Sequence, residues 1–327
     1  MSTGSGVPGA DADAPTRIPP LGWWQVVRRA VAESSSDNVP VLAGGVAFFA
    51  FLALFPALIA ASTLYGLVAD PATVSRQVEN LAGALPEEAQ PLVAGILQSL
   101  TSPAGSTLGI GLAVSVLAAL WSASGGTSNL MTAVNLAYDE EESRGFVRLR
   151  GTALALTLGA IVFVLLALTL VGVVPVVIDV LALGTAGTVL AEIVRWGLLV
   201  VVVVVALAVV YRVAPDRDAP RFRWVSPGAV VATALWVLGS IAFSLYVNNF
   251  SSFNATYGAL AGVVVLMLWL YLTSYIVLLG AEINSESERQ TRRDTTRGEP
   301  EPMGLRQARA ADTVAGEAPD RDRASSR

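Results

Sequence analysis

The chain contains no cysteine, no histidine and no lysine, and only 14% of its 327 residues are charged. Without cysteine it forms no disulfide and has no thiol nucleophile or thiolate metal ligand. Without histidine it lacks the side chain that most often acts as a general base or metal ligand near neutral pH. A typical soluble domain carries about 25% charged residues. This composition therefore points away from an ordinary soluble protein.

Apolar residues are abundant instead. Hydrophobic side chains make up 54% of the chain and the mean hydropathy is +0.60. About 20 apolar helical residues are needed to cross a hydrocarbon layer roughly 30 Å thick, and irregular backbone cannot face lipid. We therefore predict an all-α, polytopic integral membrane protein with six transmembrane helices. The predicted spans are 41–69, 107–138, 152–179, 189–213, 227–248 and 257–283.

The placement of arginine predicts the orientation. All 21 basic residues are arginine. Nineteen of them lie in the N-terminal segment, the second and fourth loops and the C-terminal tail, whereas Arg76 and Arg195 alone fall in the first and third loops. Cytoplasmic loops carry the excess of basic residues. We therefore expect a multi-pass protein of the bacterial plasma (inner) membrane with both termini in the cytoplasm.

The two ends of the chain are polar. Residues 1–21 are rich in Gly, Pro, Ala and Asp, and residues 285–327 carry mixed charge with few apolar side chains. Such compositions do not bury enough apolar surface to fold. We predict two disordered tails on either side of a membrane domain at 22–284, the second of them a cytoplasmic tail.

A short amphipathic helix is predicted at 22–34. Trp23, Val27, Ala30 and Val31 share one face at helical spacing, and the arginines avoid that face. Tryptophan and arginine on such a helix are typical of a segment that lies in the membrane interface. The alternative is an ordinary helix that packs against protein.

Small and polar residues line one face of the second predicted span. Ser122 and Asn129 lie on this face at helical spacing, and Asn135 follows one to two turns later. Small residues let helices approach closely, and serine or asparagine side chains form hydrogen bonds across helices. Two interpretations stay open: helix packing, or a polar path for a lipid head group.

Other candidate polar residues lie near the last two spans. Asn249, Asn254 and Tyr257 are expected at the outer mouth of any such path. Glu282 lies near the end of the sixth span, where the helix dipole disfavours a carboxylate. We therefore expect an arginine partner from the fourth loop, Arg221 or Arg223, and leave open whether this ion pair is structural or functional.

The sequence favours a non-catalytic protein. The carboxylates of 139–142 are consecutive, so they do not converge as spaced metal ligands do. No phosphate-binding G-x-x-x-x-G-K-[ST] motif occurs. We expect no enzyme activity, no metal, no cofactor and no nucleic-acid partner.

Four segments together resemble a known family. They are 42–56 (LAGGVAFFAFLALFP), 135–138 (NLAY), 250–260 (FSSFNATYGAL) and 268–284 (LWLYLTSYIVLLGAEIN). They look like the YihY/BrkB family of bacterial inner-membrane proteins, once labelled ribonuclease BN. The resemblance implies six spans and a role in handling envelope lipids. The sequence does not support the nuclease label, because a hydrolytic nuclease needs a general base or metal cluster and a basic groove, and we find neither in the sequence.

The expected function is transport or accommodation of a lipid or lipid-like envelope component. The spans carry no strongly charged residue near their middle, which argues against an ion-coupled carrier. Membrane lipids are then the expected partners. The alternative is a non-catalytic scaffold in envelope assembly, which binds envelope proteins or a second copy of the chain.

Overall fold

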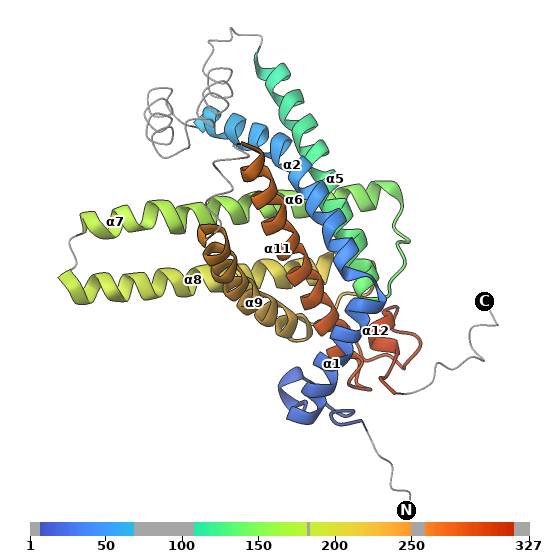
Figure 1. Cartoon of the computed structure of the whole chain (residues 1–327). Helices are drawn as coiled ribbons and strands as arrows, with labels where there is room; N and C mark the ends of the chain where they lie inside the picture. Colours follow the sequence, from blue (N-terminus) through green and yellow to red (C-terminus); the bar gives the residue numbers. More distant parts are fainter. Residues whose placement is uncertain (1–6, 69–107, 182–183, 250–258, 317–327) are drawn as a thin grey trace, which may run out of the picture.

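The computed structural model describes residues 7–68, 108–181, 184–249 and 259–316, and every regular element within them is helical (Figure 1). The predicted all-α class is thus confirmed for these residues. A long helical segment lies at each of the six apolar runs. These segments are α2 (Val39–Val68), α5 (Leu108–Ala137), α6 (Phe146–Leu168) with its continuation, α8 (Gly184–Val213), α9 (Phe222–Asn249) and α11 (Ala259–Glu288).

The number of membrane spans is supported less fully than the number of helices. Within the described ranges, four helices are long and apolar enough to cross a bilayer. A fifth is added if Pro20–Ser36 and Val39–Leu54, which meet at 69°, form one broken span. The structure therefore shows a multi-pass pattern with four or five candidate spans. Six spans stay a prediction.

The third span changes its winding near its end. α6 passes into a π-helical turn, η2 (Thr169–Val173), and then into α7 (Val174–Val180). Pro175 is the second residue of α7, just after η2; it has no N–H to donate, and its ring displaces the carbonyl one turn earlier. The wider π turn accommodates that displacement.

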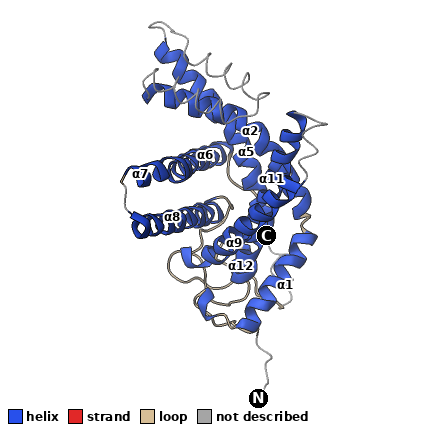
Figure 2. Ribbon diagram, turned by 60° about the vertical axis from the view of Figure 1, so that its left-hand side comes forward, coloured by secondary structure: helices blue, strands red, loops and turns tan. Residues whose placement is uncertain are grey.

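The helices form two groups. α2, α5 and α11 pack side by side, and α9 packs on α11. α6 with α7 and α8 form a hairpin that extends sideways from this group, contacting it through α5 and α9 (Figures 1 and 2). The buried core lies where the helices converge, around Met131, Tyr211 and Leu278.

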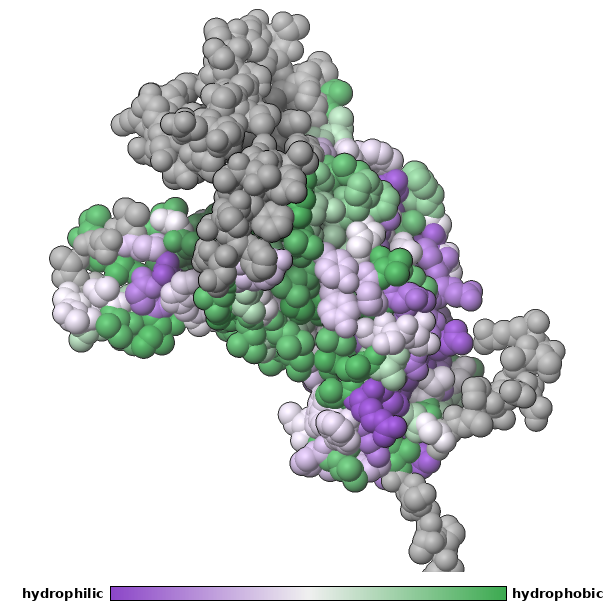
Figure 3. Space-filling model, in the orientation of Figure 1, coloured by the Kyte–Doolittle hydropathy of each residue, from purple (hydrophilic) through white to green (hydrophobic). Residues whose placement is uncertain are grey.

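Apolar side chains face outward along the helices. Val162, Leu190 and Leu238 are among many large apolar residues that the protein itself leaves exposed. Figure 3 shows green, hydrophobic surface over the helices and purple, hydrophilic surface toward the end that holds α1. So much exposed apolar area is not expected of a soluble monomer, and a bilayer supplies the missing apolar contact.

A helix, α1 (Pro20–Ser36), lies at the position of the predicted amphipathic helix, but the face that it buries differs from the predicted apolar face. Gly22, Val26, Ala30 and Ser34 are the buried residues, and α1 packs on α11. Val27 and Val31, predicted to share the apolar face with Ala30, are exposed. α1 therefore packs on protein through small residues, because these allow close approach to α11, and the interfacial role stays a prediction.

The prediction of disordered tails is wrong for the residues that the structure describes. Residues 7–21 and 289–316 fold together into a unit that we call the terminal cap, which includes η1 (Pro15–Arg17) and α12 (Arg309–Asp312). The Thr291 hydroxyl donates to the Ala10 and Ala12 carbonyls at 3.1 and 2.6 Å. The backbone N–H of Arg297 donates to Ala219 O at 3.0 Å. The cap folds because backbone groups from distant segments satisfy one another.

Candidate functional site

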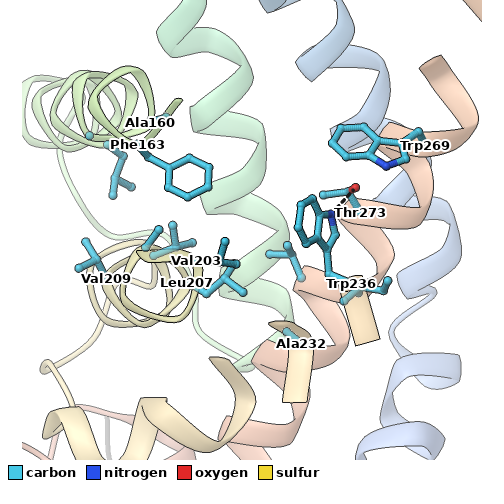
Figure 4. A pocket seen from close by; sticks show the side chains of 15 residues that line it. Ala160, Phe163, Val203, Leu207, Val209, Ala232, Trp236, Trp269 and Thr273 are labelled. Atoms are coloured by element: carbon cyan, nitrogen blue, oxygen red, sulfur yellow. Dashed lines mark hydrogen bonds between the residues drawn. The ribbon is translucent and has the colours of Figure 1, made fainter. Parts of the chain in front are cut away.

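An apolar cavity of about 420 Å³ lies between the α6–α8 hairpin and the α9–α11 pair. Its size falls in the range of about 300–1,000 Å³ that is usual for small-molecule sites. Figure 4 shows side chains from both groups pointing into the space between them. Residues that line it include Ala160, Phe163, Val203, Leu207, Trp236 and Thr273.

Small residues open this space within helices that otherwise carry bulky side chains. Gly159 and Ala160 on α6, Ala206 on α8 and Ala232 on α9 all line the cavity. A Cβ added to Gly159 would meet no atom within 4 Å. The pattern of Ala and Gly among Val and Leu therefore leaves a hollow where the hairpin meets α9 and α11.

The polar groups at the cavity wall satisfy each other. The Trp236 indole N–H donates to the Thr273 hydroxyl at 3.2 Å. The Trp236 ring packs edge-on against Trp269, with 6.0 Å between the ring centroids. The wall therefore offers apolar contact and no charge, which suits hydrocarbon rather than an ion or a sugar.

A separate polar network lies at the end of α5. The Asn135 amide donates to Glu142 Oε2 at 2.9 Å and accepts from the Asp216 N–H at 2.7 Å. Arg144 donates to both Glu142 oxygens and to Ala214 O at 2.8 Å. The hydrogen bond from Arg144 lowers the pKa of Glu142. Asn135 thus ties the α5–α6 loop to the α8–α9 loop.

Glu282 is buried, with 2% of its surface exposed, and its Oε1 has no hydrogen-bond partner among the described residues. The charged groups that face it include Asp37, Glu286 and Arg289. The predicted pairing with Arg221 or Arg223 is wrong for Arg221, which donates to backbone carbonyls of the terminal cap. Arg223 is exposed and is not among the charged groups that face Glu282. Arg221 therefore holds the α8–α9 loop to the terminal cap and does not pair with Glu282.

Sequence reasoning missed a buried ion pair, Arg217 with Glu288. Arg217 and Glu288 are both fully buried and lie 2.7 Å apart, with the Tyr138 ring 5.2 Å from the Arg217 guanidinium carbon. Burial by itself would lower the pKa of Arg217, but the charge and hydrogen bond of Glu288, together with Tyr138 and Glu140, outweigh burial, and the arginine pKa is raised. The available signal was the run of polar residues from Asn284 to Glu288, which continues an apolar helix without a break.

The remaining predicted site residues do not converge in the described part of the chain. Ser122 is exposed, and the Asn129 amide donates to Gly125 O of its own helix at 2.8 Å. Asn249 is the last residue of α9. Asn254 and Tyr257 lie outside the described residues. The polar path through these residues therefore stays a hypothesis.

Part of the small-residue face of α5 serves helix packing. A Cβ on Gly126 would lie 2.9 Å from the Cβ of Ala53 and 3.1 Å from the Phe49 carbonyl oxygen, both on α2. Such distances require glycine if the two backbones are to approach this closely. This observation favours the packing interpretation at Gly126.

Within the described ranges, no group of three or more acidic side chains is arranged to hold a metal ion. The site is therefore an apolar cavity together with buried ion pairs near the terminal cap.

Comparison with known proteins places residues 30–304 within the family model described as Virulence factor BrkB. A protein of Bacillus subtilis (strain 168) named as ribonuclease-like, YfkH, is 37% identical over 247 residues, which is 73% of this chain and 86% of YfkH. The UPF0761 membrane protein IL2447 of Idiomarina loihiensis is 38% identical over 95 residues, 29% of this chain and 33% of that protein. A UPF0761 membrane protein of Alteromonas mediterranea is 47% identical over 77 residues, 24% of this chain and 26% of that protein. No solved structure matches the chain.

Proposed function

Because the chain belongs to the Virulence factor BrkB family and is a multi-pass membrane protein, we propose that it moves or accommodates a lipid or lipid-like amphiphile of the cell envelope. The cavity between the α6–α8 hairpin and α9–α11 carries this proposal. It lies among helices that bear lipid-facing apolar side chains, and its wall is apolar. A hydrocarbon chain has no polar group that would lose hydrogen bonds on entering such a space, and the burial of its apolar surface is favourable.

The proposed placement is the bacterial plasma membrane, with six spans and both termini in the cytoplasm. The positive-inside asymmetry of 19 arginines against two supports this orientation. The packing of the two chain ends into one terminal cap supports it as well, because segments that fold together lie on the same side of a membrane. The helices at the six apolar runs support the number of spans.

A non-transporting scaffold is the second candidate. The exposed apolar residues Trp24, Val27 and Val31 on α1 favour it, because they form a stripe next to the terminal cap that a partner or the membrane interface would cover. The ribonuclease-like name belongs to YfkH. For this chain we keep the proposal of a protein without catalytic activity.

Filling the cavity is expected to abolish lipid movement. In proteoliposomes with head-group-labelled lipids and a membrane-impermeant quencher, the wild-type chain should accelerate flipping over empty vesicles. Val203→Trp places an indole in the cavity from α8 and should reduce the rate to that of empty vesicles. Val205→Trp is the matched control, because Val205 is exposed on the same helix and does not line the cavity.

Equal rates in Val203→Trp and Val205→Trp would contradict a role for the cavity. No acceleration by the inserted wild-type chain across several lipid classes would favour the scaffold candidate.

A further inference from the structure

The α6–α8 hairpin contains an arginine inside one of its apolar helices. Arg195 lies within α8, which is long and apolar enough to cross a membrane. A charged side chain within such a helix is costly and usually has a specific task. The protein itself buries Arg195, whose side chain is 12% exposed. Its contacts indicate what that task is.

The helix that faces Arg195 has a gap in its backbone hydrogen bonding. At the end of η2, the Val174 N–H donates to Thr169 O, five residues earlier. The next N–H along the chain would be that of residue 175, and it would reach Leu170 O in π-helical bonding or Val171 O in α-helical bonding. Residue 175 is proline, which has no N–H to donate. A backbone carbonyl that lacks a donor is costly within a membrane.

Arg195 supplies the donor that Pro175 lacks. Its Nη1 group donates to Leu170 O at 3.3 Å and to Val171 O at 3.4 Å, which are the two carbonyls that an N–H at position 175 would reach. Its Nη2 group donates to Glu192 Oε2 at 2.5 Å, one turn earlier on α8, and this carboxylate compensates the guanidinium charge. One side chain thus joins α8 to the irregular turn of the facing helix.

This contact lies toward the outer end of the hairpin, where α7 runs beside α8 (Figure 1). The opposite end of the hairpin has a polar contact of its own, from Arg144 to Ala214 O. Around Arg195, α7 and α8 expose large apolar side chains such as Val177 and Ile193. In lipid there is no hydrophobic driving force between apolar helices, so packing and hydrogen bonds between helices decide their placement. The bonds from Arg195 therefore have a large share in placing α7 against α8.

We propose that η2 is a hinge in the hairpin and that Arg195 is the latch that closes this hinge. With the latch closed, the carbonyls beside the proline are bonded and α7 is held against α8. With the latch released, those carbonyls lose their donor, and the segment from η2 to α7 bends away from α8. Pro175 and Arg195 are then parts of one device, because the proline interrupts the helical bonding and the arginine fixes the direction of the interrupted part.

The first test measures the distance between α7 and α8 in the full-length chain in lipid nanodiscs. The native chain has no cysteine, so spin labels introduced at Val177→Cys and Ile193→Cys, both at exposed positions, report this distance. The labelled chain should give a narrow distribution. Arg195→Met removes the donor at similar side-chain length and should broaden the distribution toward longer distances. Adding Pro175→Ala restores a backbone N–H at the break and should make the distribution narrow again.

Pro227→Ala is the matched control for Pro175→Ala. Pro227 also lies inside a helix, α9, whereas the carbonyls that Arg195 binds belong to η2. A backbone N–H restored at position 227 should therefore leave the Arg195→Met distribution broad. An unchanged distribution in Arg195→Met would overturn the proposal, and so would a rescue by Pro227→Ala equal to that by Pro175→Ala.

The second test is thermal unfolding of the same variants, without labels, in detergent. Arg195→Met should lower the unfolding midpoint, and most of that loss should disappear in the Pro175→Ala background, where the backbone supplies the hydrogen bond. If Arg195→Met does not fold, the double variant Arg195→Met/Pro175→Ala should still do so. Equal losses in the two backgrounds, or failure of both variants to fold, would show that Arg195 does not stand in for the missing N–H. Neither readout involves lipid movement, so the latch and the proposed function stand or fall separately.

Discussion

Replacing Arg217 by alanine is expected to destabilise the folded protein by about 3–5 kcal/mol, which is the usual cost of removing one partner of a buried ion pair. Arg217 and Glu288 are both fully buried and lie 2.7 Å apart. The Thr295 hydroxyl also donates to Glu288. Without the guanidinium, the carboxylate at the end of α11 stays in a place that water does not reach, and its charge is uncompensated. The Tyr138 ring also loses its contact with the arginine.

The measurement is the thermal unfolding midpoint of the purified chain in detergent, compared with Arg223→Ala. Arg223 is exposed near the start of α9, and its removal should shift stability by less than about 0.5 kcal/mol. The double variant Arg217→Met/Glu288→Leu should recover much of the loss, because it removes both charges and keeps the volume. Equal midpoints for Arg217→Ala and Arg223→Ala would show that the pair contributes nothing to the fold.

Replacing Gly228 by alanine is expected to force α9 away from α11. A Cβ at this position would lie 2.1 Å from the Gly280 carbonyl oxygen and 2.6 Å from the Asn284 side chain. The obstacle is backbone of the facing helix, so no side-chain rotation relieves it. The Asn284 amide also accepts from the Gly228 N–H at 2.7 Å and donates to Val225 O at 3.1 Å, and both bonds would lengthen. We expect a loss of about 1–3 kcal/mol, as for other overpacked sites.

Gly197→Ala is the matched control for Gly228→Ala. Gly197 also lies within a helix, α8, and a Cβ there would meet nothing within 4 Å. Alanine is favoured over glycine inside a helix by roughly 0.5–1 kcal/mol, so this variant should unfold at the wild-type temperature or slightly above it. A Gly228→Ala protein as stable as Gly197→Ala would contradict the close crossing of α9 and α11.

The helices were predictable because each apolar run carries its own signal. A run such as 198–210 has to be helical in a bilayer, whatever its neighbours are. The terminal cap was not predictable for the opposite reason. Thr291 bonds to Ala10 and Ala12, and these contacts join opposite ends of the chain without any periodic pattern. Composition alone gave the incorrect prediction of disorder at 285–316.

The candidate site was predicted only in part. Glu282 was expected to need a compensating group at its helix end, and it is buried among charged groups. The identity of those groups depended on the α1–α2 turn, which local sequence does not place against α11. The cavity was not predicted, because residues such as Val203 and Val205 are the same in sequence, and only the packing decides which of them lines a hollow.

The central claim is that hydrocarbon enters the cavity, and acyl-chain quenching of tryptophan fluorescence tests it most directly. Of the seven tryptophans, a variant would keep only Trp236, at the cavity wall, and would carry phenylalanine at the other six. A second variant would keep only Trp196, which is exposed on α8. Both would be placed in lipids brominated on their acyl chains. We predict that Val203→Phe sharply reduces the quenching of Trp236 and leaves that of Trp196 unchanged. Quenching of Trp236 that is absent, or that is the same with Val203→Phe as without it, would contradict the account.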